Sequence, residues 1–200
     1  REDAAVDLAT PETATAFFKA AKARVATHGM ELRTVLATSG LDEIKRGISG
    51  REQKIALLLN AVQAMGAAGI PILAYNFKLL NSKLLRSAPT QGRGSSTYIS
   101  FDYDEYVKKP AKPVTPPVSE EKMWDNITYF LKAMVPAAEQ SGVRMALHPD
   151  DPPVPHGIPP LAGAAHIASN FDQFHRIFGI VPSPSNGMLF CQGCVTEMRG

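Results

Sequence analysis

The sequence predicts an α/β fold with a parallel sheet, because a helix followed by an apolar strand recurs four times along its 200 residues. The expected strands are continuous apolar runs, a pattern typical of parallel strands that are covered on both faces. Four such units are half of a (β/α)8 TIM barrel, which needs about 250 residues. We therefore expect one domain over residues 1–200 that is a partial β/α barrel, with a small open α/β sheet as the alternative.

The first two units lie in the first 77 residues. Thr10 is expected to cap the first helix, and residues 30–37 form the strand after it. Ser49 and Glu52 have the spacing of a capping box at the start of the second helix, which leads to a strand over residues 70–77. In both units a glycine separates the helix from the strand, as expected at a helix end.

The third and fourth units lie in the second half of the chain. Ser119 is expected to cap a helix that Pro136 kinks, and residues 143–148 form the next strand. A shorter helix starts near Asn170 and leads to a strand over residues 187–191. No helix is expected after this last strand.

Residues 81–118 interrupt this alternation and are expected to form a long loop or lid insertion. Glycine, serine, proline and lysine are frequent there, and no helical stripe is present, so we expect a mobile segment. Long loops at this end of barrel strands often cover the active site, whereas a plain surface insertion is the alternative. The part over residues 100–106 is expected to be ordered, because it combines aromatic and acidic residues.

The composition, 44% hydrophobic and 20% charged, is that of an ordinary globular protein. The formal charge of +2 is too small, and the basic residues are too dispersed, to predict a nucleic-acid partner. No apolar run reaches the roughly 20 residues of a membrane helix, and the start lacks a signal-peptide pattern. Two cysteines give no disulfide framework, so a cytoplasmic location is expected. Because the chain starts with Arg1, we expect it to be part of a longer protein.

Two of the expected strands end on side chains that bind metals. His148 ends the strand over residues 143–148, and Cys191 ends the strand over residues 187–191. The carboxyl ends of barrel strands meet on the face that carries the chemistry. Imidazole and thiolate suit zinc, iron(II) and manganese(II), so we expect a divalent-metal site with further ligands from elsewhere. For either residue alone, an inert core position is the alternative.

Other polar residues lie near the ends of these strands. Asp150 and Asp151 are candidate catalytic residues, or they orient the histidine that precedes them, with loop capping as the alternative. Asn76 and Asn186 are candidate substrate contacts, although Asn186 can also be explained as a turn residue.

The remaining motifs carry little signal. Cys194 completes a Cys-x-x-Cys pair, but because the pair follows a strand and is not expected to open a helix, we interpret Cys194 as incidental. The sequence has no P-loop, no dinucleotide-binding glycine motif after a strand and no nucleophile elbow. The other histidines have no partner at metal-ligand spacing, and His156 is the one that most merits attention.

Four segments of the sequence resemble mannonate dehydratase, and they cover residues 68–77, 100–105, 145–153 and 183–193. The His-Pro-Asp-Asp-Pro-Pro run and the Ser-Asn-Gly run that leads to Cys-Gln-Gly are specific in combination. This family consists of metal-dependent (β/α)8 barrels, related to the xylose-isomerase-like enzymes. Its members convert D-mannonate to 2-keto-3-deoxy-D-gluconate and water in hexuronate breakdown.

The resemblance implies a hydro-lyase whose small-molecule substrate is a sugar acid. It implies that His148 and Cys191 are two of the ligands of Mn²⁺ or Fe²⁺. The remaining ligands, a histidine and an aspartate, and most acid and base residues are then expected from later strands that this chain does not contain. A homo-oligomer is one option for the assembly.

The sequence departs from the family pattern in three places. Residues 38–40 replace a glutamate-containing run, the stretch after Phe77 lacks a tryptophan, and residues 157–161 lack an arginine. Because an arginine is a natural clamp for a carboxylate, its absence keeps a metal-dependent sugar isomerase or epimerase as an alternative. A catalytically inactive barrel fragment is a further alternative, because only two metal ligands are expected in this chain.

Overall fold

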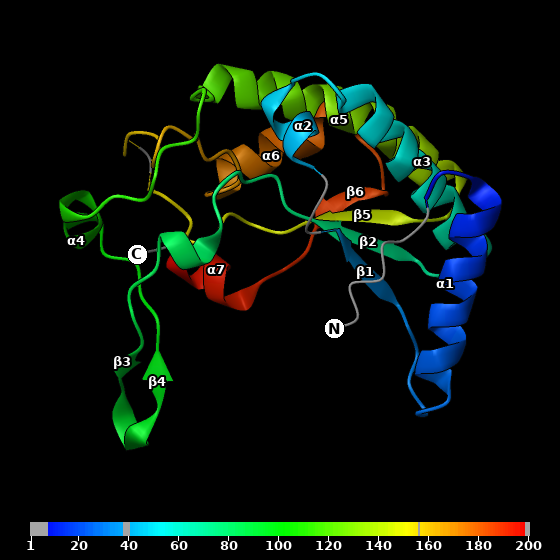
Figure 1. Ribbon diagram of the computed structural model, residues 1–200, viewed down its shortest axis with the longest axis horizontal. Helices are drawn as coiled ribbons and strands as arrows, with labels where there is room; N and C mark the ends of the chain where they lie inside the picture. The colour runs from blue at the N-terminus through cyan, green and yellow to red at the C-terminus, as the bar shows by residue number, and fades with distance from the viewer. Residues whose placement is uncertain (1–7, 38–40, 156, 199–200) are drawn as a thin grey trace.

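Four short parallel strands form the central sheet in the computed structural model of the chain, which describes residues 8–37, 41–155 and 157–198. They are β1 (Thr34–Ala37), β2 (Ile72–Tyr75), β5 (Arg144–Leu147) and β6 (Asn186–Met188), in the spatial order β1-β2-β5-β6 (Figure 1). The predicted α/β fold with a parallel sheet is therefore confirmed. Each strand is shorter than the apolar run that predicted it, because only part of each run pairs with a neighbour.

A layer of helices covers one face of the sheet (Figure 1). It contains α1 (Pro11–Ala26), α2 (Asp42–Arg46), α3 (Arg51–Ala67), α5 (Glu120–Gln140) and α6 (Phe171–Ile180), with α1 packed against α3. Phe130 of α5 packs on Tyr75 of β2 with ring centroids 5.4 Å apart. The helix α5 contains Pro136 and continues beyond it to Gln140. None of the helices in the described ranges is both long and apolar enough to cross a membrane.

The opposite face of the sheet is only partly covered. Ile72 and Ala146 are half-buried there, and Leu36 on the edge strand is 52% exposed. The prediction that the strands are covered on both faces is therefore wrong for the described residues. The strand order advances in one direction, so right-handed crossovers return every helix over the same face. One-directional winding of this kind also occurs in β/α barrels, whereas a doubly wound sheet has helices on both faces.

Two of the predicted helix caps, Thr10 and Ser119, are confirmed. Each accepts a hydrogen bond from the backbone N–H three residues later, and Asn170 caps α6 in the same way. The capping box predicted at Ser49 is wrong, because α3 begins after Gly50 and has no side-chain cap. With φ at 92°, Gly50 adopts a left-handed conformation that residues with a side chain rarely accept.

The segment 81–118 contains short elements of its own. These are η1 (Ser82–Leu84), β3 (Thr90–Gln91), η2 (Arg93–Ser95), β4 (Thr97–Tyr98) and α4 (Tyr103–Lys108). Strands β3 and β4 pair as an antiparallel hairpin that projects from the rest of the molecule (Figure 1). Asp102 caps α4 by accepting a hydrogen bond from the N–H of Glu105, so residues 100–106 include the expected ordered part. The role of the segment as a mobile lid stays a prediction.

A helix follows the last strand, contrary to the prediction. It is α7 (Gln192–Glu197), and Cys191 is the residue that precedes its first turn. A helix of six residues is too short to show the apolar periodicity by which longer helices are recognised in a sequence. The Cys-x-x-Cys pair therefore does open a helix.

Candidate metal centre

The pairing of the strands brings the ends of β5 and β6 to the same edge of the sheet. The backbone N–H of His148 donates to the carbonyl oxygen of Tyr75 at 2.7 Å, and the N–H of Leu189 donates to that of Leu147 at 2.9 Å. Both bonds extend the parallel ladder one step past the strands. The segments that carry the two predicted metal ligands therefore leave the sheet side by side at its carboxyl edge.

Three side chains converge at this edge. One potential ligand atom each from His148, Cys191 and Cys194 lies within 4.8 Å of the other two. Among the described residues, these three form the cluster of histidine, cysteine or acidic side chains that is close enough together to hold a metal ion. The predicted convergence of His148 and Cys191 is confirmed, whereas their role as ligands stays a proposal. Cys194, which we expected to be incidental, belongs to the same cluster.

The imidazole of His148 is oriented by its own loop. Its Nδ1 lies 2.6 Å from the carbonyl oxygen of Pro149. Because a carbonyl oxygen only accepts hydrogen bonds, Nδ1 must carry the proton and donate it. The neutral ring then has an unprotonated Nε2, which is the form that binds metals.

Cys194 is the more buried of the two thiols. It is 5% exposed, whereas Cys191 is half-buried. Burial, together with a hydrogen bond to Cys191, raises the pKa of the Cys194 thiol. A bound cation acts in the opposite direction and favours the thiolate.

Asp150 is almost completely buried, and one of its carboxylate oxygens is held by two hydrogen bonds. Its Oδ2 accepts hydrogen bonds from the N–H of Ala168 at 2.8 Å and from the hydroxyl of Ser169 at 3.2 Å. Its own N–H donates to the carbonyl oxygen of Ala168 at 2.9 Å. These bonds fasten the loop after His148 to the segment before α6.

Asp151 belongs to a charged network that sequence reasoning missed. Arg86 donates from Nε (3.1 Å) and Nη2 (2.5 Å) to Oδ1 of Asp151, and from Nη1 and Nη2 to the carboxylate of Glu197 (3.0 and 2.8 Å). Lys78 donates to the backbone oxygen of Asp151 at 3.0 Å and to the hydroxyl of Ser82. The network ties the loop after His148 to α7.

The charged groups of this network shift one another's pKa values. Burial alone would raise the pKa of Asp151, but the hydrogen bonds from Arg86 and Ser82 and the charge of Lys78 lower it overall. Burial lowers the pKa of Lys78, with Asp151 and Asp150 opposing that effect. The carboxylate of Asp151 is therefore the stable form at neutral pH.

Asn76 follows β2 at the same edge and is held by a buried lysine. Its Oδ1 accepts a hydrogen bond from Nζ of Lys45 at 3.0 Å, and the same ammonium donates to the carbonyl oxygen of Lys78 at 2.8 Å. Burial lowers the pKa of Lys45 to about 8, against the raising influence of Asp42 and Asp150. With its oxygen occupied, Asn76 presents its NH₂ group as the part that can bind a ligand.

The prediction for Asn186 needs correction, because the structure places it at the other end of the strand. Asn186 is the first residue of β6 and pairs with Met145, so it lies at the amino edge of the sheet. Its Nδ2 donates to the carbonyl oxygens of Ile177 and Val181, at 3.3 and 3.2 Å. These bonds satisfy carbonyls at the end of α6, which is a structural role.

The remaining predicted positions do not join the cluster. His28, His166 and His175 are exposed or half-buried and are not part of it. His156 and residues 38–40 lie outside the described residues. Of the residues that sequence reasoning missed, Cys194 had a signal in its spacing from Cys191, whereas Arg86 lies in a segment rich in glycine and serine with no pattern to mark it.

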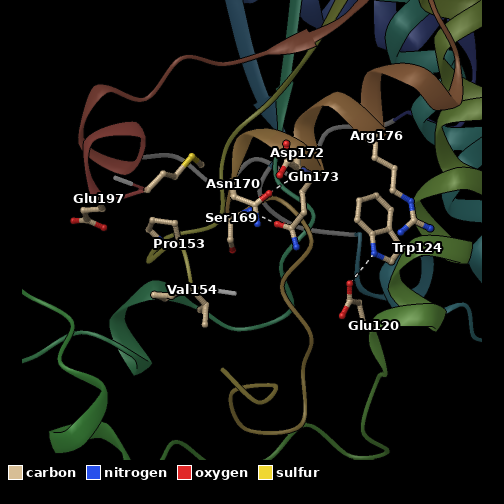
Figure 2. A pocket seen from close by; sticks show the side chains of 12 residues that line it. Glu120, Trp124, Pro153, Val154, Ser169, Asn170, Asp172, Gln173, Arg176 and Glu197 are labelled. Atoms are coloured by element: carbon tan, nitrogen blue, oxygen red, sulfur yellow. Dashed lines mark hydrogen bonds between the residues drawn. The ribbon is translucent and has the colours of Figure 1, made fainter. Parts of the chain in front are cut away.

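A cavity of about 600 Å³ opens between α7, residues 153–155 and the amino ends of α5 and α6 (Figure 2). Arg176 stacks on the ring of Trp124 at 3.8 Å, and Nε1 of Trp124 donates to Glu120 at 3.1 Å. Glu197 is a lining residue that also binds Arg86. The donor cluster itself is not part of this lining.

Comparison with known proteins agrees with the motifs. Residues 108–199 match the model of the family described as D-mannonate dehydratase (UxuA). The mannonate dehydratases of Streptococcus pneumoniae (strain 70585) and Streptococcus suis (strain 05ZYH33) are 31% and 30% identical to this chain, over 86% of it and 52% of their own length. The crystal structure of mannonate dehydratase from Streptococcus suis serotype 2 superposes with a TM-score of 0.74 at 29% identity, covering 88% of this chain and 50% of that one.

The chain thus spans about half the length of the curated relatives that it matches. The resemblance to mannonate dehydratase, predicted from four sequence segments, is confirmed by the family model, the relatives and the solved structure.

Proposed function

We propose that this chain provides the His148 and Cys191 part of the metal site of a (β/α)8 barrel that dehydrates a sugar acid. The reaction proposed is the conversion of D-mannonate to 2-keto-3-deoxy-D-gluconate and water. The convergence of an imidazole and a thiol at the carboxyl edge of a parallel sheet carries the proposal. The one-directional winding and the matches to mannonate dehydratase support it.

The side chains at this edge fit a divalent transition metal. His148 has its Nε2 free for an ion, because Nδ1 is bound to Pro149, and Cys191 adds a sulfur donor. Mn²⁺ and Fe²⁺ are the ions that the resemblance implies. When bound, such an ion supplies Lewis-acid stabilisation of negative charge on the substrate oxygens.

The dehydration needs a base for the proton next to the carboxylate and an acid for the departing hydroxyl. Asp150 uses its Oδ2 to hold Ala168 and Ser169, and Asp151 is held by Arg86. We therefore assign both aspartates, our candidates for catalysis, to positioning the loop after His148. The acid and base are then expected elsewhere in the whole protein.

Asn76 remains the candidate substrate contact in this chain. Lys45 binds its oxygen, and its NH₂ group has no acceptor among the described residues. Because an amide NH₂ donates hydrogen bonds, it suits a hydroxyl or carboxylate oxygen of a sugar acid. Fixing the amide by a buried lysine also reduces the entropy lost on binding.

An assay of the intact protein tests the proposal. The purified protein, loaded with Mn²⁺ or Fe²⁺, is given D-mannonate, other aldonates and a panel of ketoses, and products are identified by NMR. We expect a 2-keto-3-deoxy acid from D-mannonate, with activity lost on chelation and restored by metal. Turnover that survives complete removal of metal would contradict the proposal.

A metal-dependent sugar isomerase or epimerase is the second candidate. Residues 157–161 lack the arginine that the family pattern has, and the stretch after Phe77 lacks its tryptophan. In the same assay, this candidate predicts that a ketose or aldose is converted to an isomer without loss of water. The mass of the product separates the two reactions, since only dehydration removes about 18 Da.

A further inference from the structure

We propose that Cys194 is a third protein donor to the metal of this site, and that its thiolate makes the site prefer zinc or iron(II) over manganese(II). The inference rests on the proposed function, because it takes His148 and Cys191 to be ligands. It goes further by adding a residue to the donor set and by predicting which metal the site selects.

The geometry of the cluster is close to that of a three-donor site. In tetrahedral coordination, bonds of about 2.3 Å to sulfur and about 2.0 Å to nitrogen place the ligand atoms roughly 3.5–3.8 Å apart. The atoms of His148, Cys191 and Cys194 all lie within 4.8 Å of one another. A contraction of at most about 1.3 Å, within the reach of side-chain rotation, converts the cluster into a coordination site.

The local fold holds both thiols on the same side of α7. The N–H of Val195 donates to the carbonyl oxygen of Cys191 at 2.9 Å, and that of Met198 donates to Cys194 at 3.0 Å. Cys191 is the cap residue of α7 and Cys194 lies in its first turn, and one ligand atom of each lies within 4.8 Å of one of His148. Glu197, bound by Arg86, fastens the helix in this orientation.

Two sulfurs change the chemistry of the site. Manganese(II) favours carboxylate, carbonyl and water ligands, whereas thiolates select zinc and iron. A set with one imidazole and one thiolate is borderline, but a second thiolate makes it markedly softer. The spacing along the helix accounts for the closeness of Cys194 to Cys191, so the approach of the Cys194 sulfur to His148 is the observation that points to a shared ion.

X-ray absorption at the zinc edge tests the inference by counting sulfur ligands in the zinc-loaded intact protein. We expect two sulfurs at about 2.3 Å in the wild type and one in Cys194→Ser. Val195→Ala changes the same helix without removing a donor, and it should keep two. In competition between Zn²⁺ and Mn²⁺, Cys194→Ser should lower the zinc preference by at least about tenfold, the lower end of the loss seen for outer-shell partners.

The outcomes separate this inference from the proposed function. One sulfur in the wild type, unchanged in Cys194→Ser, would overturn the role of Cys194 while leaving the His148 and Cys191 site intact. A Cys191–Cys194 disulfide in the metal-loaded protein would overturn it as well. A wild type that binds neither Zn²⁺ nor Mn²⁺ would remove the proposed metal site itself. The number of sulfur ligands in the wild type tests the role of Cys194 without any variant. The inference can therefore be tested even if the Cys194→Ser protein does not fold.

Discussion

Arg86 and Asp151 are joined by two hydrogen bonds from one guanidinium, with Nε and Nη2 at 3.1 and 2.5 Å from Oδ1. The same guanidinium also holds Glu197, three residues after Cys194. Asp151 lies three residues after His148. One side chain from the segment 81–118 therefore positions both pieces of chain that carry the donor cluster.

Replacing Arg86 by methionine should loosen the cluster. The side chain of Arg86 is 9% exposed and its partners are 28% and 42% exposed, so solvent weakens the pair and we expect about 1–2 kcal/mol of lost stability. Metal affinity should fall by about 10–100-fold, as when outer-shell partners are lost. Isothermal titration with Zn²⁺ measures it. Arg93→Met, in the projecting hairpin, is the matched control and should bind as the wild type does.

His148→Ala and Cys191→Ala should each abolish metal binding while most of the fold remains. Both side chains lie in the segments that follow β5 and β6 and are half-buried, so neither fills the core. Metal content by mass spectrometry and the thermal midpoint by circular dichroism measure the two effects separately. Full metal content and turnover in Cys191→Ala would show that the ligand assignment is wrong.

Lys45 should make stability depend on pH in the alkaline range. Its pKa is about 8 in the folded protein, whereas the ordinary pKa of a lysine, taken for the unfolded chain, is 10.5. Between these values the unfolded chain binds more protons, so the free energy of unfolding rises as pH rises from about 8 to about 10.5. The full shift corresponds to about 3 kcal/mol.

Urea unfolding at several pH values measures this dependence, and Lys45→Met provides the comparison. The difference between wild type and variant should change across the interval, in favour of the wild type at higher pH. A difference that stays constant from pH 8 to 10.5 would mean that Lys45 does not titrate in this range.

The sequence was informative where long apolar patterns and chain direction decide the structure. The parallel strands, the caps at Thr10 and Ser119, and the convergence of His148 with Cys191 all follow from local rules. Contacts between distant residues were not predictable in this way. Arg86 reaches Asp151 across 65 positions, and nothing in its neighbourhood in the sequence marks it.

Short elements and uncovered surface account for the other errors. The helix α7 has six residues, too few for a periodic signal, so the position of Cys194 was missed. A continuous apolar strand indicates burial, but whether a second layer covers the face opposite the helices depends on chain packing that one strand does not encode. Leu36, 52% exposed on β1, is the clearest example.

Asn186 and Asn76 offer a direct test of what position on a strand means for function. Asn186 is 8% exposed and donates to two carbonyls at the end of α6. Asn186→Ala leaves those acceptors unpaired, so we expect about 1–3 kcal/mol of lost stability with KM for D-mannonate unchanged. Asn76→Ala, at the carboxyl edge, should instead raise KM by about tenfold or more, the factor for one lost hydrogen bond of about 1.4 kcal/mol.

Urea unfolding and steady-state kinetics on the same two variants separate these roles. Lys45 remains near position 76 in the second variant without its amide partner, so some loss of stability is expected there too. The two roles are therefore distinguished by comparing, for each variant, the increase in KM with the loss of stability. If Asn186→Ala raised KM as much as Asn76→Ala did, the amino edge of β6 would have to contact substrate, and the structural role derived from its hydrogen bonds would be wrong.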